Sequence, residues 1–325
     1  MILVCGGLAD DVTACVCARL EYEGDAYRLL DLGRYPEGYA VRWVWEGDGP
    51  VGEIAGPGWR LDLAEIGAVY ARDIDARGHA LAETAGVETA AAVLGECQAG
   101  VEALLEQLPC PVVNRGGGMA ANMSKPFQLG QIARAGLGAP RTLVTSDPEA
   151  ARAFCAACGG DVIFKSLSGV RSIVRRVAAR DLARLPLLRH GPAQFQQYVP
   201  GDNIRVHTVG GEIFATRIRT AAVDYRYARG QGHDLTMEPA RLPTWVEAAC
   251  RALAAEAGLL MAGIDLRETP EGEYVCFEVN PSPGFIWFER GSGQPISAAL
   301  AALLRRGGRE TLHEGTTARA VGVPA

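Results

Sequence analysis

The chain has 325 residues, of which 48% are hydrophobic and 22% are charged, and its formal net charge is -6. This length is about twice that of a usual domain, so two or three packed units are expected. The acidic balance argues against sequence-independent binding to nucleic acid, which needs a concentrated basic surface. No segment approaches the ~20 apolar residues of a membrane span, and the N-terminus lacks signal-peptide features. The cytoplasm is therefore the expected location, with no membrane or nucleic-acid partner.

The first part of the chain, residues 1–113, alternates strand and helix patterns. Such alternation predicts an open, largely parallel sheet of the α/β class. Within it, residues 41–63 alternate apolar and polar side chains and carry turn residues, which predicts an antiparallel excursion in the same domain.

The glycine-rich segment 114–125 is the predicted domain boundary, because glycines relax the backbone and bury little surface. A central unit is expected over residues 114–190, with a helix after Lys125 and another capped by Ser146 or Asp147. Residues 191–308 are expected to form an antiparallel unit with two hairpins, and 309–325 a loosely ordered tail.

The nine cysteines are odd in number and scattered, so reduced thiols are expected. Cys155 and Cys158 form an isolated CxxC in an Ala-rich segment of helical pattern. The spacing places both thiols on one helix face, and core packing is favoured over a redox or metal role. The five histidines show no ligand spacing, which disfavours zinc chemistry.

The hairpin pattern of residues 263–284 concentrates oxygen-bearing side chains at one end. A regular TPEG loop would place Asp265 opposite Cys276 and diagonal to Glu278, with Asn280 on the same face as Glu278. Hard oxygen ligands without His or Cys indicate Mg²⁺ or Mn²⁺. The alternative is a polar, solvent-facing strand whose Asn-Pro step begins a turn.

Lysine occurs only at positions 125 and 165 among the 32 basic residues. Lys125 opens a predicted helix after the glycine-rich loop, and Lys165 ends an apolar strand and precedes a Ser/Gly loop. Both positions suit contact with phosphate oxygens. Two surface lysines are the alternative. A Walker loop and a GxGxxG motif are absent, which disfavours a dinucleotide site.

The order of these motifs resembles an ATP-grasp ligase over residues 110–305. The shared features are Lys125, Lys165, the segment FQQYVPGDNIR and the hairpin ending EVNPSPG. NIRVHTVGGEIFATRIR resembles the RimK-like group, whereas TLVTSDPEA and GIDLRETPEGEYVCFEVNP resemble microviridin-type graspetide ligases, which form ester and amide links in ribosomal peptides. The resemblance implies an ATP-grasp fold behind the N-terminal α/β domain, with ATP and Mg²⁺ as cofactors.

The resemblance also implies the nucleotide contacts. The phosphates would meet the two lysines. The adenine would meet the side chains or backbone of four consecutive residues, Gln196, Gln197, Tyr198 and Val199. The ribose contact would fall to Asp202 or Asn203, because Asn replaces the acidic residue that opens the related DIR motif.

The metal and the reacting phosphoryl group would be held by the carboxylate hairpin and by arginine. The implied Mg²⁺ ligands are Asp265, Glu278 and Asn280. Arg205, with Asn280, would stabilise the transferring phosphate, where a fixed guanidinium contributes most; an exposed strand arginine is the alternative. Arg219 and Arg226 are weaker candidates for the same cleft, since a regular Gly-Gly hairpin puts Arg219 on the opposite strand face.

The hypothesis that follows is an ATP-dependent ligase that activates a carboxylate as an acyl phosphate and joins it to an amine or hydroxyl. A peptide or protein is the favoured substrate. The alternatives are ligation of an amino acid or small metabolite, and a nucleotide-binding module that regulates without catalysis. If the chain is an oligomer, a homodimer is the default expectation.

Overall fold

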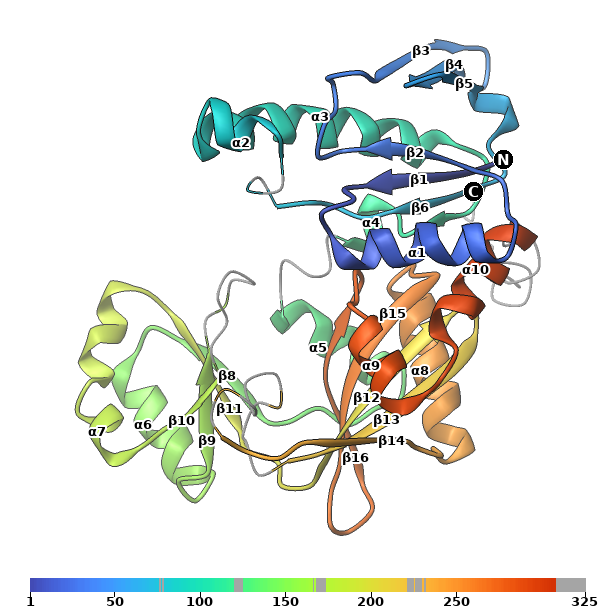
Figure 1. Cartoon of the computed structure of the whole chain (residues 1–325). Helices are drawn as coiled ribbons and strands as arrows, with labels where there is room; N and C mark the ends of the chain where they lie inside the picture. The colour runs from blue at the N-terminus through green and yellow to red at the C-terminus, as the bar shows by residue number, and fades with distance from the viewer. Residues whose placement is uncertain are drawn as a thin grey trace, which may run out of the picture.

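Three units make up the molecule in the computed structural model, which describes residues 1–75, 77, 79–119, 125–165, 167, 174–220, 225, 230 and 232–307. Figure 1 shows an N-terminal unit, a central subdomain and a C-terminal subdomain. The predicted tail, 309–325, lies outside the described residues. In the described ranges, no helix is both long and apolar enough to cross a membrane.

The N-terminal unit is built on a four-stranded sheet of order β2-β1-β6-β7, in which all neighbours are parallel. Alternate residues of β1 face opposite sides, so Ile2 and Val4 pack towards α1 while Leu3 and Cys5 pack towards α3. The predicted parallel sheet is confirmed. The elements are β1 (Ile2–Gly6), α1 (Asp11–Tyr22), β2 (Tyr27–Asp31), β6 (Ala68–Ala71), α2 (Leu81–Thr84), α3 (Val87–Gln107) and β7 (Val112–Val113).

The predicted antiparallel excursion is also present, as a separate sheet of order β3-β4-β5. Gly47 and Asp48 form the two-residue loop between its first two strands, and Gly47 has a φ of 60° that suits glycine. The elements are β3 (Ala40–Glu46), β4 (Gly49–Gly56), β5 (Trp59–Asp62) and the short 3-10 helix η1 (Leu63–Glu65).

The central subdomain has a sheet of order β10-β9-β11-β8 and a small core of its own. Asp147 caps α6, since its side chain accepts the Glu149 N–H at 2.9 Å. Cys155 lies in the core and Cys158 packs against it, both as free thiols. The elements are β8 (Thr142–Thr145), α6 (Pro148–Ala157), β9 (Val162–Lys165), β10 (Arg175–Arg176), α7 (Ala179–Leu182), η4 (Leu185–His190) and β11 (Ala193–Gln197).

The C-terminal subdomain is an antiparallel sheet of order β14-β13-β12-β15-β16, and it contains both predicted hairpins. Helices pack on its faces. The elements are α5 (Lys125–Arg134), β12 (Asp202–Val209), β13 (Glu212–Arg219), β14 (Thr236–Pro239), α8 (Thr244–Glu256), β15 (Met261–Glu268), β16 (Tyr274–Asn280), α9 (Ile286–Ser292) and α10 (Ile296–Arg306). The short helix α4 (Gly116–Met119) lies at the junction with the N-terminal unit, where the Gly117 N–H donates to Glu106 Oε1 of α3 at 3.4 Å.

Two elements lie in a different unit from the one predicted. β11 pairs with β8 and β9, so a boundary at residue 190 separates this strand from its sheet. α5 packs on the C-terminal sheet, where Gln128 donates to the Val279 carbonyl at 2.8 Å and accepts the Val279 N–H at 3.1 Å. Both assignments depend on partners distant in sequence, which local patterns do not encode.

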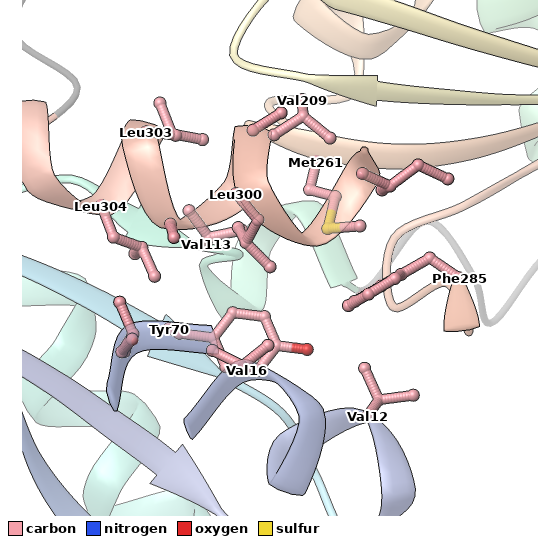
Figure 2. Close-up of a cluster of buried hydrophobic side chains, with 14 of the residues drawn as sticks. Val12, Val16, Tyr70, Val113, Val209, Met261, Phe285, Leu300, Leu303 and Leu304 are labelled. Carbon is pink, nitrogen blue, oxygen red and sulfur yellow. The ribbon is translucent and has the colours of Figure 1, made fainter. Parts of the chain in front are cut away.

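The N-terminal unit and the C-terminal subdomain share one hydrophobic core, shown in Figure 2. α10 lies between α1 and the C-terminal sheet, and its leucines face both. The contributing side chains are Val12, Val16, Tyr70 and Val113 from the first unit, and Val209, Met261, Phe285, Leu300, Leu303 and Leu304 from the second. These two parts therefore bury their apolar surfaces against each other.

Asn114 adds a polar clamp to this shared core. Its Nδ2 donates to the Met261 carbonyl at 2.7 Å and the Pro281 carbonyl at 2.5 Å. Its Oδ1 accepts the Leu260 N–H at 2.9 Å and the Met261 N–H at 3.1 Å. The buried amide thus uses its full hydrogen-bonding capacity to tie the residue after β7 to β15 and to the segment that follows β16.

We expect Asn114→Ala to lower the free energy of unfolding by about 2–4 kcal/mol, because it leaves several buried backbone N–H and C=O groups without their hydrogen-bond partner. Urea unfolding followed by circular dichroism measures the change. Gln98→Ala is the control, since the half-buried Gln98 donates only one hydrogen bond, to Ile74, among those formed with described residues. Equal losses in the two variants would contradict the clamp.

Candidate functional site

A cleft lies between the central and C-terminal sheets and contains about 800 Å³ of empty space, its open mouth included. Its walls come from β9, β11, β12, β15 and β16 and from the segment that joins β11 to β12. It gathers most of the predicted site residues, namely Lys125, Lys165, Gln196, Gln197, Tyr198, Val199, Asn203, Asp265 and Glu278.

The carboxylates at this cleft face each other directly across two strands. Asp265 of β15 pairs with Glu278 of β16, whereas the predicted register placed Asp265 opposite Cys276 and is wrong. Leu266 pairs with Cys276, so a bulge accommodates Phe277 as one extra residue on β16. The bulge brings the two carboxylates closer than the diagonal arrangement would.

Arg205 extends this alignment onto a third strand. It pairs with Asp265 in the β12–β15 ladder, and its Nη1 donates to Asp265 Oδ1 at 2.9 Å. The Tyr225 hydroxyl donates to the same oxygen at 3.2 Å. Burial alone would lower the pKa of Arg205, but Asp265, Tyr225 and Glu278 together raise it. The exposed-arginine alternative is excluded, since Arg205 is 5% exposed.

Gly263 gives the Arg205 guanidinium room to lie across β15. A Cβ at Gly263 would sit 2.0 Å from Arg205 Nη2 and 2.7 Å from Pro283 Cβ. On another side, the guanidinium carbon lies 5.4 Å from the centre of the Phe288 ring. Glycine, the aromatic ring and Asp265 therefore fix both the position and the orientation of this buried cation.

The two lysines are not surface residues. Lys165 is 5% exposed at the end of β9, and the Lys125 side chain is 14% exposed at the start of α5. Lys125 Nζ lies 3.5 Å from Glu278 Oε2, which links the first lysine to the carboxylate pair. Cations removed from water in this way need anionic partners, so the two ammonium groups make this part of the cleft suited to an anion.

Polar groups of β11 and of the segment after it line another part of the cleft, away from the carboxylate pair. Gln196 is 1% exposed and donates through Nε2 to Thr142 Oγ1 at 3.0 Å. Its buried Oε1 accepts no hydrogen bond from any described residue. The Tyr198 N–H donates to the Asp161 carbonyl at 2.9 Å, so this donor is occupied by the central sheet. An acceptor such as Gln196 Oε1 suits an amino group on the ligand.

Arg267 is a cleft residue that sequence reasoning missed. Its Nη1 donates to the Val199 carbonyl at 2.7 Å and its Nη2 to Asn203 Oδ1 at 2.5 Å. Burial lowers the pKa of Arg267. Its guanidinium carbon lies 5.7 Å from the Tyr198 ring centre and 5.4 Å from that of Phe277. The sequence contained one indication of its role: Arg267 lies two residues after Asp265 on one strand, so both side chains face the same side of the sheet.

Other predicted residues lie outside the cleft lining. Asp202 Oδ2 accepts from Arg217 at 2.8 Å and from Arg219 at 3.4 Å, and Arg219 also pairs with Glu238 at 2.9 Å. The β12–β13 register puts Arg219 on the opposite face from Arg205, as a regular hairpin predicted, so the structure does not bring it to the site. Arg226 lies outside the described residues.

Asn280 lies two residues beyond Glu278 on β16 and faces the same side. Its Oδ1 accepts the Ser282 N–H at 2.9 Å, which forms a turn at the end of the strand. The described residues contain no group of three or more His, Cys, Asp and Glu that could hold a metal. Two carboxylates with a neighbouring amide remain a hard-oxygen donor set that fits Mg²⁺.

Comparison with solved structures gives similarity over nearly the whole chain. The ATP-grasp ligase PsnB, complexed with a phosphomimetic variant of its minimal precursor, Mg and ADP, is 28% identical with a TM-score of 0.80, covering 94% of this chain and 98% of that one. The macrocyclase MdnC from Microcystis aeruginosa, bound with precursor peptide MdnA, is 26% identical with a TM-score of 0.77, covering 94% and 99%.

Curated sequences match a shorter part. "Probable alpha-L-glutamate ligase 2" of Pseudoalteromonas atlantica is 25% identical over 58% of this chain, and the match spans 65% of that relative. Beta-citrylglutamate synthase B of Danio rerio is 27% identical over 61% of this chain and 51% of its own length. The RimK-like ATP-grasp domain matches residues 121–304, which is more than half of the sequence. The chain therefore belongs to the RimK-like ATP-grasp family.

Proposed function

We propose that the chain is an ATP-dependent ligase that activates a carboxylate as an acyl phosphate and joins it to an amine or hydroxyl of a peptide. The observation that carries this proposal is the convergence of Lys125, Lys165 and the Asp265–Glu278 pair on one cleft, with Arg205 hydrogen-bonded to Asp265. A site for adenine alone would not need this concentration of charge at its other end. The charge arrangement favours phosphoryl transfer over a purely regulatory nucleotide site.

The residues that line the cleft support ATP binding along its length. Gln196 Oε1 would accept from the adenine amino group, while the Tyr198 carbonyl and the Val199 N–H would face the purine edge. Asn203 lines the cleft and is held by Arg267, so it would contact the ribose, whereas Asp202 pairs with arginines and does not line the cleft. The two buried lysines would meet the phosphates.

Asp265 and Glu278, with Asn280 nearby, would hold Mg²⁺, which when bound neutralises phosphate charge. The protein's own contribution is positioning. Arg205 holds its donors in a fixed plane beside Asp265, where they would stabilise the charge on the transferred phosphoryl group and on the acyl phosphate. Because Arg205 is oriented before substrate arrives, little reorganisation remains for the reaction itself.

A peptide substrate is supported by the extent of the similarity. PsnB and MdnC, each solved with its precursor peptide, match 94% of this chain, including the N-terminal unit. The alpha-L-glutamate ligase matches 58% and supports a second candidate, addition of an amino acid to a substrate. Mass spectrometry separates the two, since an internal ester or amide removes one water from the peptide, whereas amino-acid addition increases its mass.

The decisive assay is ADP and phosphate release from Mg-ATP with short peptides that contain Thr, Ser or Lys and Asp or Glu, beside pooled amino acids. Release stimulated by a peptide, together with loss of one water from it, supports the proposal. Stimulation by amino acids alone supports the second candidate. ATP binding without acceptor-stimulated release in either pool would overturn both.

We expect Glu278→Gln to lower acceptor-stimulated ADP release on the order of 10²-fold or more, because it removes a charge from the metal and phosphate end of the cleft. Glu273→Gln is the matched control, since Glu273 is exposed on the same hairpin and outside the cleft lining. A raised Mg²⁺ requirement in the first variant alone identifies the metal site. Wild-type rates in both variants would contradict the assignment.

We also expect Gly263→Ala to lower turnover on the order of 10²-fold while ATP still binds, because its methyl group displaces the Arg205 guanidinium. The control is Gly138→Ala, beside the same sheet, whose Cβ would meet the Tyr274 carbonyl at an ordinary 3.6 Å. Turnover and isothermal titration with ADP measure the two effects. A parallel loss of ATP binding and turnover would contradict a role for Arg205 in the transfer step.

A further inference from the structure

Arg72 joins the N-terminal unit to the turn that follows the carboxylate hairpin. It comes directly after β6, and its backbone N–H donates to the Cys5 carbonyl at 2.9 Å, which continues the parallel ladder between β1 and β6. Its side chain is 16% exposed, and its guanidinium crosses to Ser282 of the C-terminal subdomain. Arg72 does not belong to the lining of the nucleotide cleft. Its contacts across the two units therefore indicate a role other than direct binding of nucleotide.

The Arg72 guanidinium is held in one orientation from two sides. On the N-terminal side, Nε donates to Asp10 Oδ2 at 2.8 Å. The same oxygen accepts the Thr13 N–H at 2.8 Å and the Thr13 hydroxyl at 3.0 Å, so the start of α1 fixes the carboxylate. On the C-terminal side, Nη1 donates to Ser282 Oγ at 2.8 Å and to the Ser282 carbonyl at 3.2 Å. A planar guanidinium serves both sides at once because its donors have a fixed geometry.

Ser282 passes this constraint on to Asn280. Its N–H donates to Asn280 Oδ1 at 2.9 Å, while its hydroxyl and carbonyl accept from Arg72. The last torsion of an asparagine side chain has broad preferences, so the backbone of Asn280 does not by itself fix where Oδ1 points. The hydrogen bond from Ser282 supplies that orientation. An amide oxygen has two lone pairs, so accepting this bond leaves a second one for a cation beside Asp265 and Glu278.

A second residue of the N-terminal unit holds the same turn. Asn114, which follows β7, donates through Nδ2 to the Pro281 carbonyl at 2.5 Å. Because β6 and β7 are neighbours in the parallel sheet, the residues after their carboxyl ends contact consecutive residues of the turn, Ser282 and Pro281. Asn114 fixes where the turn lies, whereas Arg72 contacts the residue that donates to Asn280. The carboxyl edge of the N-terminal sheet thus supports the end of the cleft that carries the carboxylates.

We propose that Arg72 is a positioning residue for the reaction and acts through Ser282 to hold Asn280 as a ligand for Mg²⁺. The proposal rests on the function proposed above, in which Asp265, Glu278 and Asn280 hold the cation. Groups that hydrogen-bond to a metal ligand orient it, and their loss typically weakens metal binding or activity about 10–100-fold. The N-terminal unit would thereby fix a ligand that the C-terminal subdomain provides.

Simple attachment of the two units is the alternative role for Arg72, and Arg19 of α1 provides the control. Arg19 crosses the same junction, since its Nε donates to Ser297 Oγ at 3.1 Å. Among the described residues its hydrogen-bond and ion-pair partners are Glu23, Glu289 and Ser297, none of which belongs to the turn at 280–282. Arg19→Gln therefore removes an arginine between the units, as Arg72→Gln does, but leaves the turn unchanged.

Binding of Mn²⁺ in the presence of ADP, measured by electron paramagnetic resonance, tests the proposal without turnover. We expect Arg72→Gln to weaken Mn²⁺ binding about tenfold or more, because Asn280 loses its fixed orientation. Arg19→Gln should bind Mn²⁺ as wild type does. Calorimetric titration with ADP in the absence of metal should give one affinity for wild type and both variants, since neither arginine lines the cleft.

A double-mutant cycle tests whether Arg72 acts through Asn280. Asn280→Ala removes the ligand oxygen, so adding Arg72→Gln to it should cause little further loss of Mn²⁺ affinity. Arg72→Lys should give an intermediate affinity, because an ammonium group keeps the charge beside Asp10 but lacks the planar fork that also reaches Ser282. Urea unfolding checks that each variant is folded under the binding conditions.

Two results would overturn the proposal while wild type binds Mn²⁺ with ADP. The first is an unchanged Mn²⁺ affinity in Arg72→Gln, and a raised KM for the acceptor peptide in the same variant would then place Arg72 at the acceptor. The second is a full effect of Arg72→Gln in the Asn280→Ala background. A wild type that binds ADP but no Mn²⁺ would instead contradict the metal site itself, and with it the proposed function on which this role depends.

Discussion

The cleft depends on the direct cross-strand alignment of Arg205, Asp265 and Glu278. A buried guanidinium is costly unless a carboxylate accompanies it, and Asp265 meets this need at 2.9 Å. Glu278 adjoins the same pair and connects it to Lys125. Neither acid therefore stands as an isolated buried anion before nucleotide binds. The arrangement is stable by itself, yet it gathers the charges that a transferred phosphate needs.

The shared core gives this alignment a rigid support. Leu300 and Leu304 of α10 pack with Val16 of α1, while Asn114 ties β7 to β15 and to the segment after β16. The N-terminal unit and the C-terminal subdomain should therefore unfold as one cooperative body. The central subdomain, which supplies the cleft wall that carries Lys165, has a separate core. Its unfolding is therefore expected to be independent of the unfolding of the other two units.

Local signals in the sequence predicted the parallel sheet, both hairpins and the two lysines, because each depends on short-range periodicity or composition. The strand register was not predictable, since the bulge at Phe277 has no glycine or other marker and shifts the pairing of Asp265 by itself. Arg267 was missed for a similar reason. Its role arises from partners on other strands, Val199 and Asn203, that no motif connects to it. The place of β11 in the central subdomain was likewise not predictable, because β11 pairs with β8 and β9, which come from earlier parts of the chain.

The scarcity of lysine has a chemical consequence. The chain carries its basic charge almost entirely as arginine, whose guanidinium stays protonated and is a poor nucleophile. Lys125 and Lys165 are the only side-chain amines, and both line the cleft. Apart from the N-terminal amine, reagents that acylate amines thus have targets only where nucleotide would bind. Acylation of the side-chain amines therefore reports on the occupancy of this one cleft.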